Sequence, residues 1–350
     1  MRRGLLLSAY AAASHRHWAN GVECWLDDID WTRLELPPRH FAWRIRGNPL
    51  TWMLREGETL GQEYDVILAT SMVDLATLIG LYPHLGRAHK VVYFHENQFA
   101  YPLAEGQRSS GEPLMVNLYT ALAADTLVFN SAYNRDSFID GARTFLKRLP
   151  ENLPAAAPLE ALRDRARVLP VPIEAGTSRS PEGGDIIVWN HRWEYDKNPE
   201  TFFGALFGLA ERGVDFRLAV MGQRFRDCPA IFDQARERLG ERLVCWGPQS
   251  SEAYRRWLDE GALVVSTTDH EFQGLAIMEA VHHGCVPLVP DRLCFPEFYE
   301  ERFRYRDDRE LETRLEAWLT SPASRPSPPD SEAWTWPALL PAYRDLLRLS

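Results

Sequence analysis

The sequence has few cysteines, and their spacing matches neither a disulfide scaffold nor a common zinc site. The five cysteines among 350 residues are odd in number and include no Cys-x-x-Cys pair. This usage is typical of reduced thiols inside the cell. The chain also lacks an apolar stretch of the roughly 20 residues that a membrane helix needs. We therefore expect a cytoplasmic protein with no membrane segment.

An excess of basic charge is missing too. The chain carries 39 Lys and Arg against 49 Asp and Glu, a net charge of −10, which is not typical of a general nucleic-acid binder. The acidic excess is uneven: residues 1–175 hold 18 basic and 20 acidic residues, and the rest hold 21 and 29, which gives net charges of −2 and −8. The first half is therefore the better suited of the two to a polyanionic partner.

The length and the apolar pattern predict two α/β domains. A chain of 350 residues exceeds the about 250–300 that one core usually supports. Short apolar runs alternate with longer amphipathic ones, which is typical of βαβ units and of Rossmann-like domains with parallel sheets. The expected strands are residues 4–9, 40–46, 64–70, 89–94 and 126–130, then 185–189, 216–221, 242–246, 262–267 and 286–289, and the expected helices include 73–81, 131–146, 198–212, 228–239 and 274–284.

Proline marks the expected boundary between the domains. Residues 149–184 contain six prolines and end in two glycines, a composition that favours a linker. We expect an N-terminal Rossmann-like domain over residues 1–175 and a C-terminal one over residues 176–335. A last helix within 336–350 is expected to pack back toward the N-terminal domain.

The segment Glu271-Phe-Gln-Gly-Leu-Ala-Ile-Met-Glu279 follows an expected strand and opens a helix. Free N–H groups at a helix start suit a phosphate, so the turn at Gly274 and Leu275 is a candidate phosphate site. Glu271 can then accept hydrogen bonds from sugar hydroxyls, and Glu279 from a ribose diol. The alternative is two unrelated surface glutamates, since glutamate is common in helices.

A second segment, Asn190-His-Arg-Trp-Glu-Tyr-Asp-Lys197, follows strand 185–189, and Asn198-Pro199 is typical of a helix start. Arg192 and Lys197 flank the expected turn. Fixed cations there would stabilise a departing nucleoside diphosphate without a metal, at about 1.5–3 kcal/mol for each charge-assisted bond. The alternative is a solvated surface pair.

Polar residues follow two strands of the first half. The segment His95-Glu96-Asn97-Gln98 comes directly after strand 89–94, and Ser14-His15 follows the first strand across one tyrosine and three alanines. Because the carboxyl ends of parallel strands line the ligand crevice, both segments are candidates for a second half of the site. A structural histidine and a helix N-cap by Ser14 are the simpler alternatives.

Residues 40–46 alternate in character. Phe41, Trp43 and Ile45 interleave with Arg44 and Arg46, so a strand would carry an apolar face and a basic face that contacts phosphates. The alternative is a half-buried edge strand with solvated arginines.

Asp28-Ile29-Asp30 has an Asp-x-Asp pattern that binds divalent ions in some transferases. It is short and lies in an expected helical stretch, Trp25 to Trp31. We therefore expect no metal site.

In order along the chain, these motifs resemble the tRNA-queuosine α-mannosyltransferase family of retaining GT-B glycosyltransferases. The resemblance covers nearly the whole chain, and its most specific part is Phe-His-Glu-Asn-Gln at 94–98. It rests on residues 36–46, 93–98, 128–131, 189–197 and 270–272. The chain departs at its first turn, where Ala12-Ala13 replaces the Gly-Gly usual before Ser-His.

The resemblance implies transfer of mannose from GDP-mannose to the cyclopentenediol of queuosine in the anticodon of tRNA(Asp), without a cofactor or metal. The donor is expected in a cleft between the domains. The donor residues are then Asn190, Arg192, Lys197, Glu271, Phe272, Gly274, Leu275 and Glu279. His95 joins Arg192, Lys197 and Glu271 around the reacting atoms, and the acceptor residues are Ser14, His15, Arg44, Arg46, Glu96, Asn97 and Gln98.

Two alternatives stay open. The same fold could transfer another sugar to a different queuosine tRNA, to a glycan or to a small metabolite. The second alternative is a non-catalytic RNA-binding module that kept the fold. Loss of catalysis is disfavoured by the presence together of Arg192, Lys197, Glu271 and Glu279. Donor hydrolysis separates an enzyme from a binding module.

Overall fold

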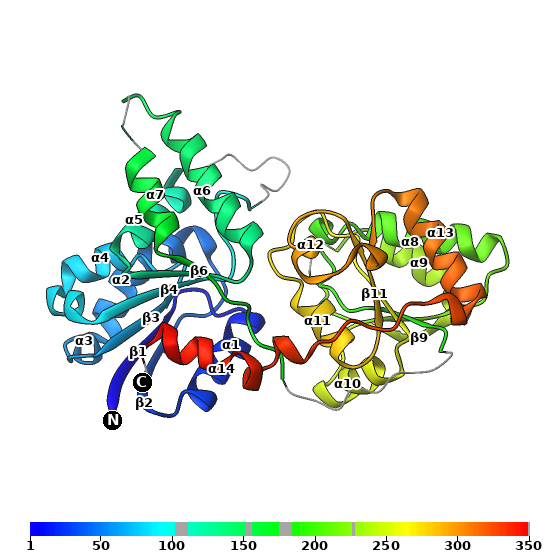
Figure 1. Cartoon of the computed structure of the whole chain (residues 1–350), viewed down its shortest axis with the longest axis horizontal. Coiled ribbons are helices and arrows are strands. Elements are labelled where there is room, and N and C mark those ends of the chain that lie inside the picture. The colour runs from blue at the N-terminus through cyan, green and yellow to red at the C-terminus, as the bar shows by residue number, and fades with distance from the viewer. Residues whose placement is uncertain (102–110, 152–153, 155, 175–183, 226–227, 349–350) are drawn as a thin grey trace. The chain divides into compact units, whose positions relative to one another are not determined.

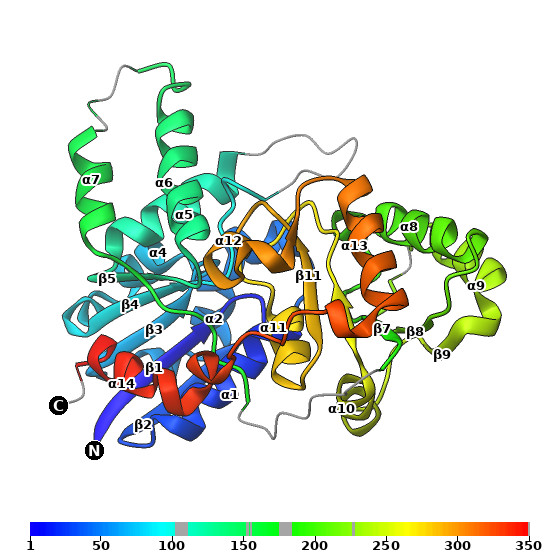
Figure 2. The ribbon, with the colours of Figure 1, turned by 45° about the vertical axis from the view of Figure 1, so that its right-hand side comes forward.

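The computed structural model describes the chain except residues 102–110, 152–153, 155, 175–183, 226–227 and 349–350. It divides into two compact units (Figure 1, Figure 2). Unit 1 comprises Met1–Pro172 and Trp336–Ser350, and unit 2 comprises Ile173–Thr335. No helix among the described residues is long and apolar enough to cross a membrane.

Unit 1 is built on a six-stranded parallel sheet in the order β2-β1-β3-β4-β5-β6. Its inner strands are mostly apolar and largely buried, as is typical of parallel sheets that are covered on both faces. The strands are β1 (Arg2–Ser8), β2 (Ile29–Glu35), β3 (Val66–Thr70), β4 (His89–Phe94), β5 (Thr126–Phe129) and β6 (Ala166–Val168), and the helices are α1 (Ala13–Trp25), α2 (Phe41–Arg55), α3 (Gly57–Leu60), α4 (Leu75–Leu81), α5 (Gly111–Ala123), α6 (Ala132–Leu146), α7 (Ala156–Asp164) and α14 (Trp336–Leu346).

Helix α14 packs on α1 in unit 1, next to β4. The indole Nε1 of Trp18 donates to the Tyr343 hydroxyl at 3.1 Å, and that hydroxyl donates to the Pro170 carbonyl at 3.0 Å. Trp336 is fully buried and occupies the space that the missing side chain of Gly21 leaves. The last helix thus belongs to the core of the first unit.

Unit 2 repeats the design with a parallel sheet in the order β12-β11-β10-β7-β8-β9. Helices flank this sheet as well (Figure 2). The strands are β7 (Ile186–Trp189), β8 (Arg217–Val220), β9 (Leu243–Trp246), β10 (Leu263–Val265), β11 (Val286–Pro290) and β12 (Arg304–Tyr305), and the helices are α8 (Pro199–Glu211), α9 (Ile231–Arg238), α10 (Ser251–Glu260), α11 (Leu275–His282), α12 (Phe295–Phe298) and α13 (Asp308–Thr320).

The predicted fold class is confirmed, but residues 40–46 are not a strand. They form the first turns of α2, whose buried residues include Ile45, Asn48, Pro49 and Trp52. This spacing of three and four is helical. The alternation that suggested a strand spans only seven residues, and it does not place Arg44 and Arg46 on a common face of a helix.

Two further expectations are wrong. Helix α1 ends at Trp25, so the stretch around Asp28 and Asp30 is a turn followed by β2. The proline-rich stretch of residues 149–184 does contain the division between the units, after Pro172, but much of it is regular structure. It includes α7 and β6, with Pro158 in the first turn of α7, where a proline is tolerated. Pro181 and Gly183 of that stretch lie outside the described residues.

The packing of Trp336 predicts a stability effect. A Cβ at Gly21 would overlap the Trp336 indole, so we expect Gly21→Ala to lower the free energy of unfolding by about 1–3 kcal/mol, the usual cost of overpacking. Gly80, also in a helix, has nothing within 4 Å of an added Cβ. Gly80→Ala is the control, and helix propensity makes it neutral or slightly stabilising. Urea unfolding measures both, and equal stability of the two variants would contradict the expectation.

Candidate functional site

Unit 2 brings its two motifs together at one edge of the sheet. The strand order changes direction between β7 and β10, which are neighbours, and ligands of open parallel sheets bind outside the carboxyl ends at such a point. The loop after β7 carries residues 190–198, and the loop after β10 carries residues 266–274. The topology therefore places both predicted motifs where a ligand site is expected.

A buried ion cluster joins the two loops. The Lys197 ammonium lies 3.2 Å from the Glu271 carboxylate and 3.3 Å from the Asp196 carboxylate, and it donates to the His270 carbonyl at 3.0 Å. Only 8% of the Lys197 side chain is exposed. Lys197 and Glu271, predicted from separate motifs, are therefore direct partners.

The cluster fixes the charges of its members. Burial raises the pKa of the Glu271 carboxyl, but the charge of Lys197, followed by that of His191, outweighs this effect and brings the pKa to about 2. Burial lowers the pKa of Lys197, while Glu271 and Asp196 raise it, and the net shift is upward. Burial and the neighbouring Lys197 lower the pKa of His191 to about 4. At neutral pH the site thus holds an ammonium, ionised Glu271 and a neutral imidazole.

A second network reaches Glu279. The Tyr254 hydroxyl donates to a Glu279 carboxylate oxygen at 3.0 Å, and the Asn190 amide donates to that hydroxyl at 3.0 Å and to the Ala276 carbonyl at 2.7 Å. The amide oxygen of Asn190 is buried and has no hydrogen-bond partner among the described residues. The network holds Glu279 on the side of α11 that faces α10 and the β7 loop.

The remaining predicted residues of unit 2 surround these networks. Arg192 is half exposed and pairs with Glu194 at 2.8 Å, while Phe272 is buried. Gly274 is the N-cap of α11 and has a positive φ of 82°. A side chain is strained in that conformation. Helix α11 starts at Leu275, so its first N–H groups point out of the helix end beside Glu271.

In unit 1, His95 and His15 form the centre of the second predicted cluster. Their rings stack with centroids 4.2 Å apart, and the His15 Nε2 lies 3.0 Å from the Glu96 carboxylate. Burial, and then the neighbouring His15 and His17, holds the pKa of His95 well below its usual range. The Nε2 of His95 is buried and finds no partner within the described part of the chain. A neutral ring of this kind can hydrogen-bond to a hydroxyl.

The Asn97 side chain holds the loop after β4 in place through buried hydrogen bonds. Its amide nitrogen donates to the carbonyl and side-chain oxygens of Asn134 and to the Ser137 hydroxyl, and its oxygen accepts from the N–H groups of Phe99 and Ala100. Asn97 is fully buried. Its side chain is therefore engaged in folding the loop and has no polar atom left to present to an acceptor.

The other predicted acceptor residues differ in their exposure and in their partners. Gln98 is half-buried and Ser14 is exposed, and the N-cap of α1 is Ala12, so the N-cap interpretation of Ser14 is wrong. Arg44 is buried in α2, and Arg46 is half exposed and pairs with Asp74 at 2.7 Å. The two arginines do not form the common basic face that the strand implied.

No group of three or more His, Cys, Asp or Glu residues that could hold a metal ion occurs in the described ranges. Asp28 forms an ion pair with Arg344, and Asp30 is exposed on β2. The Asp-x-Asp pattern is thus spread over a turn and a strand edge.

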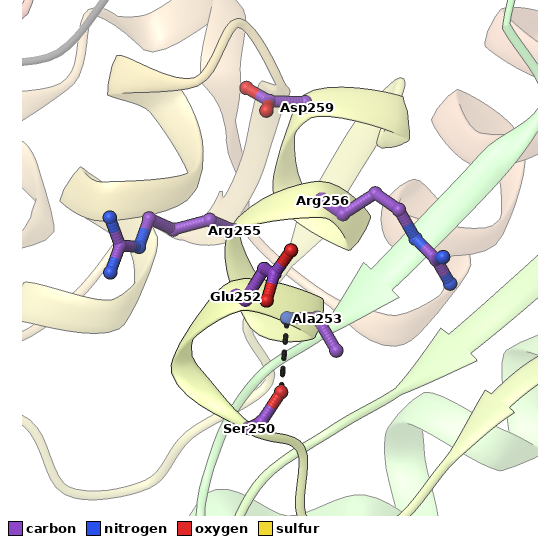
Figure 3. A pocket seen from close by; sticks show the side chains of 6 residues that line it. All are labelled: Ser250, Glu252, Ala253, Arg255, Arg256 and Asp259. Carbon is purple, nitrogen blue, oxygen red and sulfur yellow. Dashed lines mark hydrogen bonds between the residues drawn. The ribbon is translucent and has the colours of Figure 1, made fainter.

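Sequence reasoning missed Tyr254, because α10 carries no motif and reads as an ordinary amphipathic helix. The Ser250 hydroxyl caps this helix by accepting from the Ala253 N–H at 3.3 Å (Figure 3). A hollow of about 520 Å³ at this helix is lined by the six residues whose side chains Figure 3 shows: Ser250, Glu252, Ala253, Arg255, Arg256 and Asp259. It includes neither Tyr254 nor Glu279 and mixes both signs of charge, so we assign it no role.

Comparisons with known proteins agree on one family and one fold. The model of the tRNA-queuosine alpha-mannosyltransferase N-terminal family matches residues 3–173. A tRNA-queuosine alpha-mannosyltransferase of Drosophila melanogaster is 33% identical, over 89% of this chain and 85% of the relative.

Two solved structures share the fold over nearly their full length. Anabaena HepE in complex with UDP and glucose has a TM-score of 0.70 at 14% identity and covers 99% of this chain and 100% of its own. Sucrose-phosphate synthase from Thermosynechococcus elongatus has a TM-score of 0.72 at 13% identity and covers 99% of both chains. At this identity the likeness shows the fold alone, which is GT-B.

The Tyr254 network predicts an effect on nucleotide affinity. Tyr254→Phe removes the hydroxyl that orients Glu279 and Asn190, so we expect GDP to bind roughly 10-fold more weakly, which corresponds to one charge-assisted hydrogen bond. Tyr119→Phe, at a tyrosine that is 47% exposed on α5 of unit 1, is the matched control and should bind as the wild type does. Isothermal titration measures both, and an unchanged Kd for Tyr254→Phe would remove Glu279 from the nucleotide site.

Proposed function

The chain belongs to the tRNA-queuosine alpha-mannosyltransferase family, and on that premise we propose that it transfers mannose from GDP-mannose to the cyclopentenediol of queuosine in the anticodon of tRNA(Asp). The reaction retains the anomeric configuration, needs no metal and takes place in the cytoplasm. The observation that carries the proposal is the Lys197–Glu271 pair at 3.2 Å, which makes one site of two motifs 74 residues apart.

The donor binds at the carboxyl edge of the unit 2 sheet. Lys197 and Arg192 hold the diphosphate, and the first N–H groups of α11 beyond Gly274 bind a phosphate oxygen. Glu271, ionised because of Lys197, accepts hydrogen bonds from the sugar. Glu279, oriented by Tyr254, accepts from the ribose hydroxyls.

The acceptor binds to unit 1. Glu96 offers a carboxylate to the secondary amine of queuosine, which is cationic at neutral pH, and Gln98 contributes a polar side chain at the same loop. His95, with its free Nε2 in the described structure, lines the reacting face. Asn97 contributes by holding the loop that presents these residues.

The transfer exchanges one bond for another at the anomeric carbon. The bond from C1 of mannose to the phosphate oxygen breaks, and a bond from C1 to one oxygen of the diol forms on the same face. The leaving phosphate takes the proton of that hydroxyl, so no protein base is needed. Arg192 and Lys197 act by stabilising the negative charge that grows on the diphosphate.

The proposed activity predicts sugar transfer that depends on the modified base. Queuosine-containing tRNA(Asp) should accept mannose from GDP-mannose, and the reaction should proceed in EDTA. Mass spectrometry of the nucleosides from the digested tRNA measures the product. The control is the same tRNA with guanosine at the wobble position.

Equal transfer of mannose to the tRNA with guanosine at the wobble position would contradict the queuosine assignment. Loss of activity in EDTA that manganese or magnesium restores would overturn metal independence. If a small diol or glycan is labelled while no tRNA is, the acceptor is a metabolite or glycan. Absence of both transfer and donor hydrolysis would point to a binding module.

Removing the exposed cation of the site tests the diphosphate role. We expect Arg192→Ala to lower kcat by roughly 10²–10³, as loss of one preorganised stabiliser does. Arg217→Ala is the matched control, because Arg217 is 53% exposed and pairs with Asp185 at 2.7 Å, much as the 47% exposed Arg192 pairs with Glu194. Lys197 is less suitable, since its removal leaves buried carboxylates unpaired and costs about 3–5 kcal/mol of stability. Equal rates for both arginine variants would refute the role.

A further inference from the structure

The segment Leu36–Arg55 has no acidic residue. It contains four arginines, Arg39, Arg44, Arg46 and Arg55, and one histidine, His40, in a chain whose net charge is −10. Burial, and then the charges of Arg39 and Arg55, lower the pKa of the Arg44 guanidinium, whereas Arg46 is paired with Asp74. The segment is therefore locally basic in a chain whose net charge is negative.

Two aromatic side chains at the start of α2 are exposed. Phe41 is 36% exposed and Trp43 is 52% exposed. The Trp43 indole lies against the backbone of Gly47, one turn further along, where an added Cβ would overlap the ring. A glycine inside a helix costs about 1 kcal/mol relative to alanine, and here it lets the ring lie against the helix while half of the side chain remains in solvent.

This surface continues from the predicted acceptor residues. The chain enters α2 from the carboxyl end of β2, and the Ala11 N–H donates to the Leu36 carbonyl at 2.9 Å. The Phe41 ring packs edge-on against Tyr10, with centroids 6.1 Å apart. Tyr10 follows β1 and precedes His15, so the aromatic pair lies at the same sheet edge as the His15–His95 stack.

We propose that Trp43 stacks on an unpaired RNA base, with Arg39 contacting an adjacent phosphate. The proposal rests on the proposed function and gives its acceptor a defined point of contact, an unpaired nucleotide of the anticodon loop beside the modified one. Sequence-tolerant stacking on an aromatic ring and charge neutralisation by arginine are the two elements of single-strand recognition. The charge favours a polyanion as the partner, because the exposed Phe41 and Trp43 lie in a 20-residue segment that has no carboxylate of its own.

The experiment measures tRNA affinity for single variants of the full chain over a range of salt concentrations. Trp43→Ala should weaken binding of queuosine-containing tRNA(Asp) by roughly 5- to 100-fold, the range for one lost base stack, with an unchanged salt dependence, because stacking displaces no counterions. Arg39→Ala should instead lower the salt slope by about one. The control is Leu54→Ala, at a residue that is 73% exposed on the same helix, and it should bind as the wild type does.

Thermal unfolding and GDP affinity of each variant are measured in parallel and should match the wild type. A folded Trp43→Ala variant that keeps full tRNA affinity would overturn the proposal. So would a variant that keeps tRNA affinity but shifts the sedimentation coefficient, since this would mark the surface as a protein contact.

The transfer assay separates this inference from the proposed function. If the wild type mannosylates queuosine tRNA and Trp43→Ala binds that tRNA normally, only the stacking surface is refuted. If the wild type transfers no sugar but Trp43→Ala loses RNA affinity, the proposed reaction fails and the stacking surface stands.

Discussion

The buried Lys197 ammonium is the interaction on which the candidate site of unit 2 depends. A charge with 8% of its side chain exposed is stable only with partners, and Glu271, Asp196 and the His270 carbonyl supply them. Folding therefore has to bring the β7 loop against the β10 loop. The hydroxyls of Thr267 and Thr268 strengthen this junction by donating to carbonyls of the β7 loop. Loss of Lys197 would leave the largely buried carboxylates of Glu271 and Asp196 without their cation.

The Lys197–Glu271 pair also determines the protonation state of Glu271. Glu271 has an ordinary pKa of 4.5 that falls to about 2 in the folded protein, so the pair stabilises the fold above the ordinary value, and this contribution is lost as the pH falls through the lower one. At neutral pH the carboxylate is fully ionised and acts as an acceptor of hydrogen bonds. One ion pair thus serves both as a structural joint between two loops and as the means of keeping Glu271 ready for hydroxyl groups.

How well the sequence predicts a feature of this structure depends on whether the feature follows from neighbouring residues or from contacts between distant elements. Short apolar runs that alternate with longer amphipathic segments, such as the run that forms β3 (Val66–Thr70), predict buried parallel strands. The rule on strand ends led from such strands to Glu271, Lys197 and His95. The seven-residue alternation around Trp43 was too short to exclude a helix, and only the later spacing of Asn48 and Trp52 reveals it. Tyr254 and the buried role of Asn97 depend on contacts between distant elements, which no local pattern carries.

An acidic protein that binds RNA must obtain affinity with few phosphate contacts. The net charge of −10 repels the phosphate backbone and so opposes non-specific electrostatic binding, and the acidic excess lies mostly outside the first half of the chain. A basic segment that also exposes Trp43 meets this constraint. Stacking of a base on an aromatic ring adds affinity that does not depend on the net charge of the protein. Stacking requires a base that is already unpaired, so duplex regions gain little from it. If Trp43 stacks on a base as proposed, overall repulsion together with this one local contact favours a loop over a helix of RNA, and the charge balance then contributes to the choice of substrate.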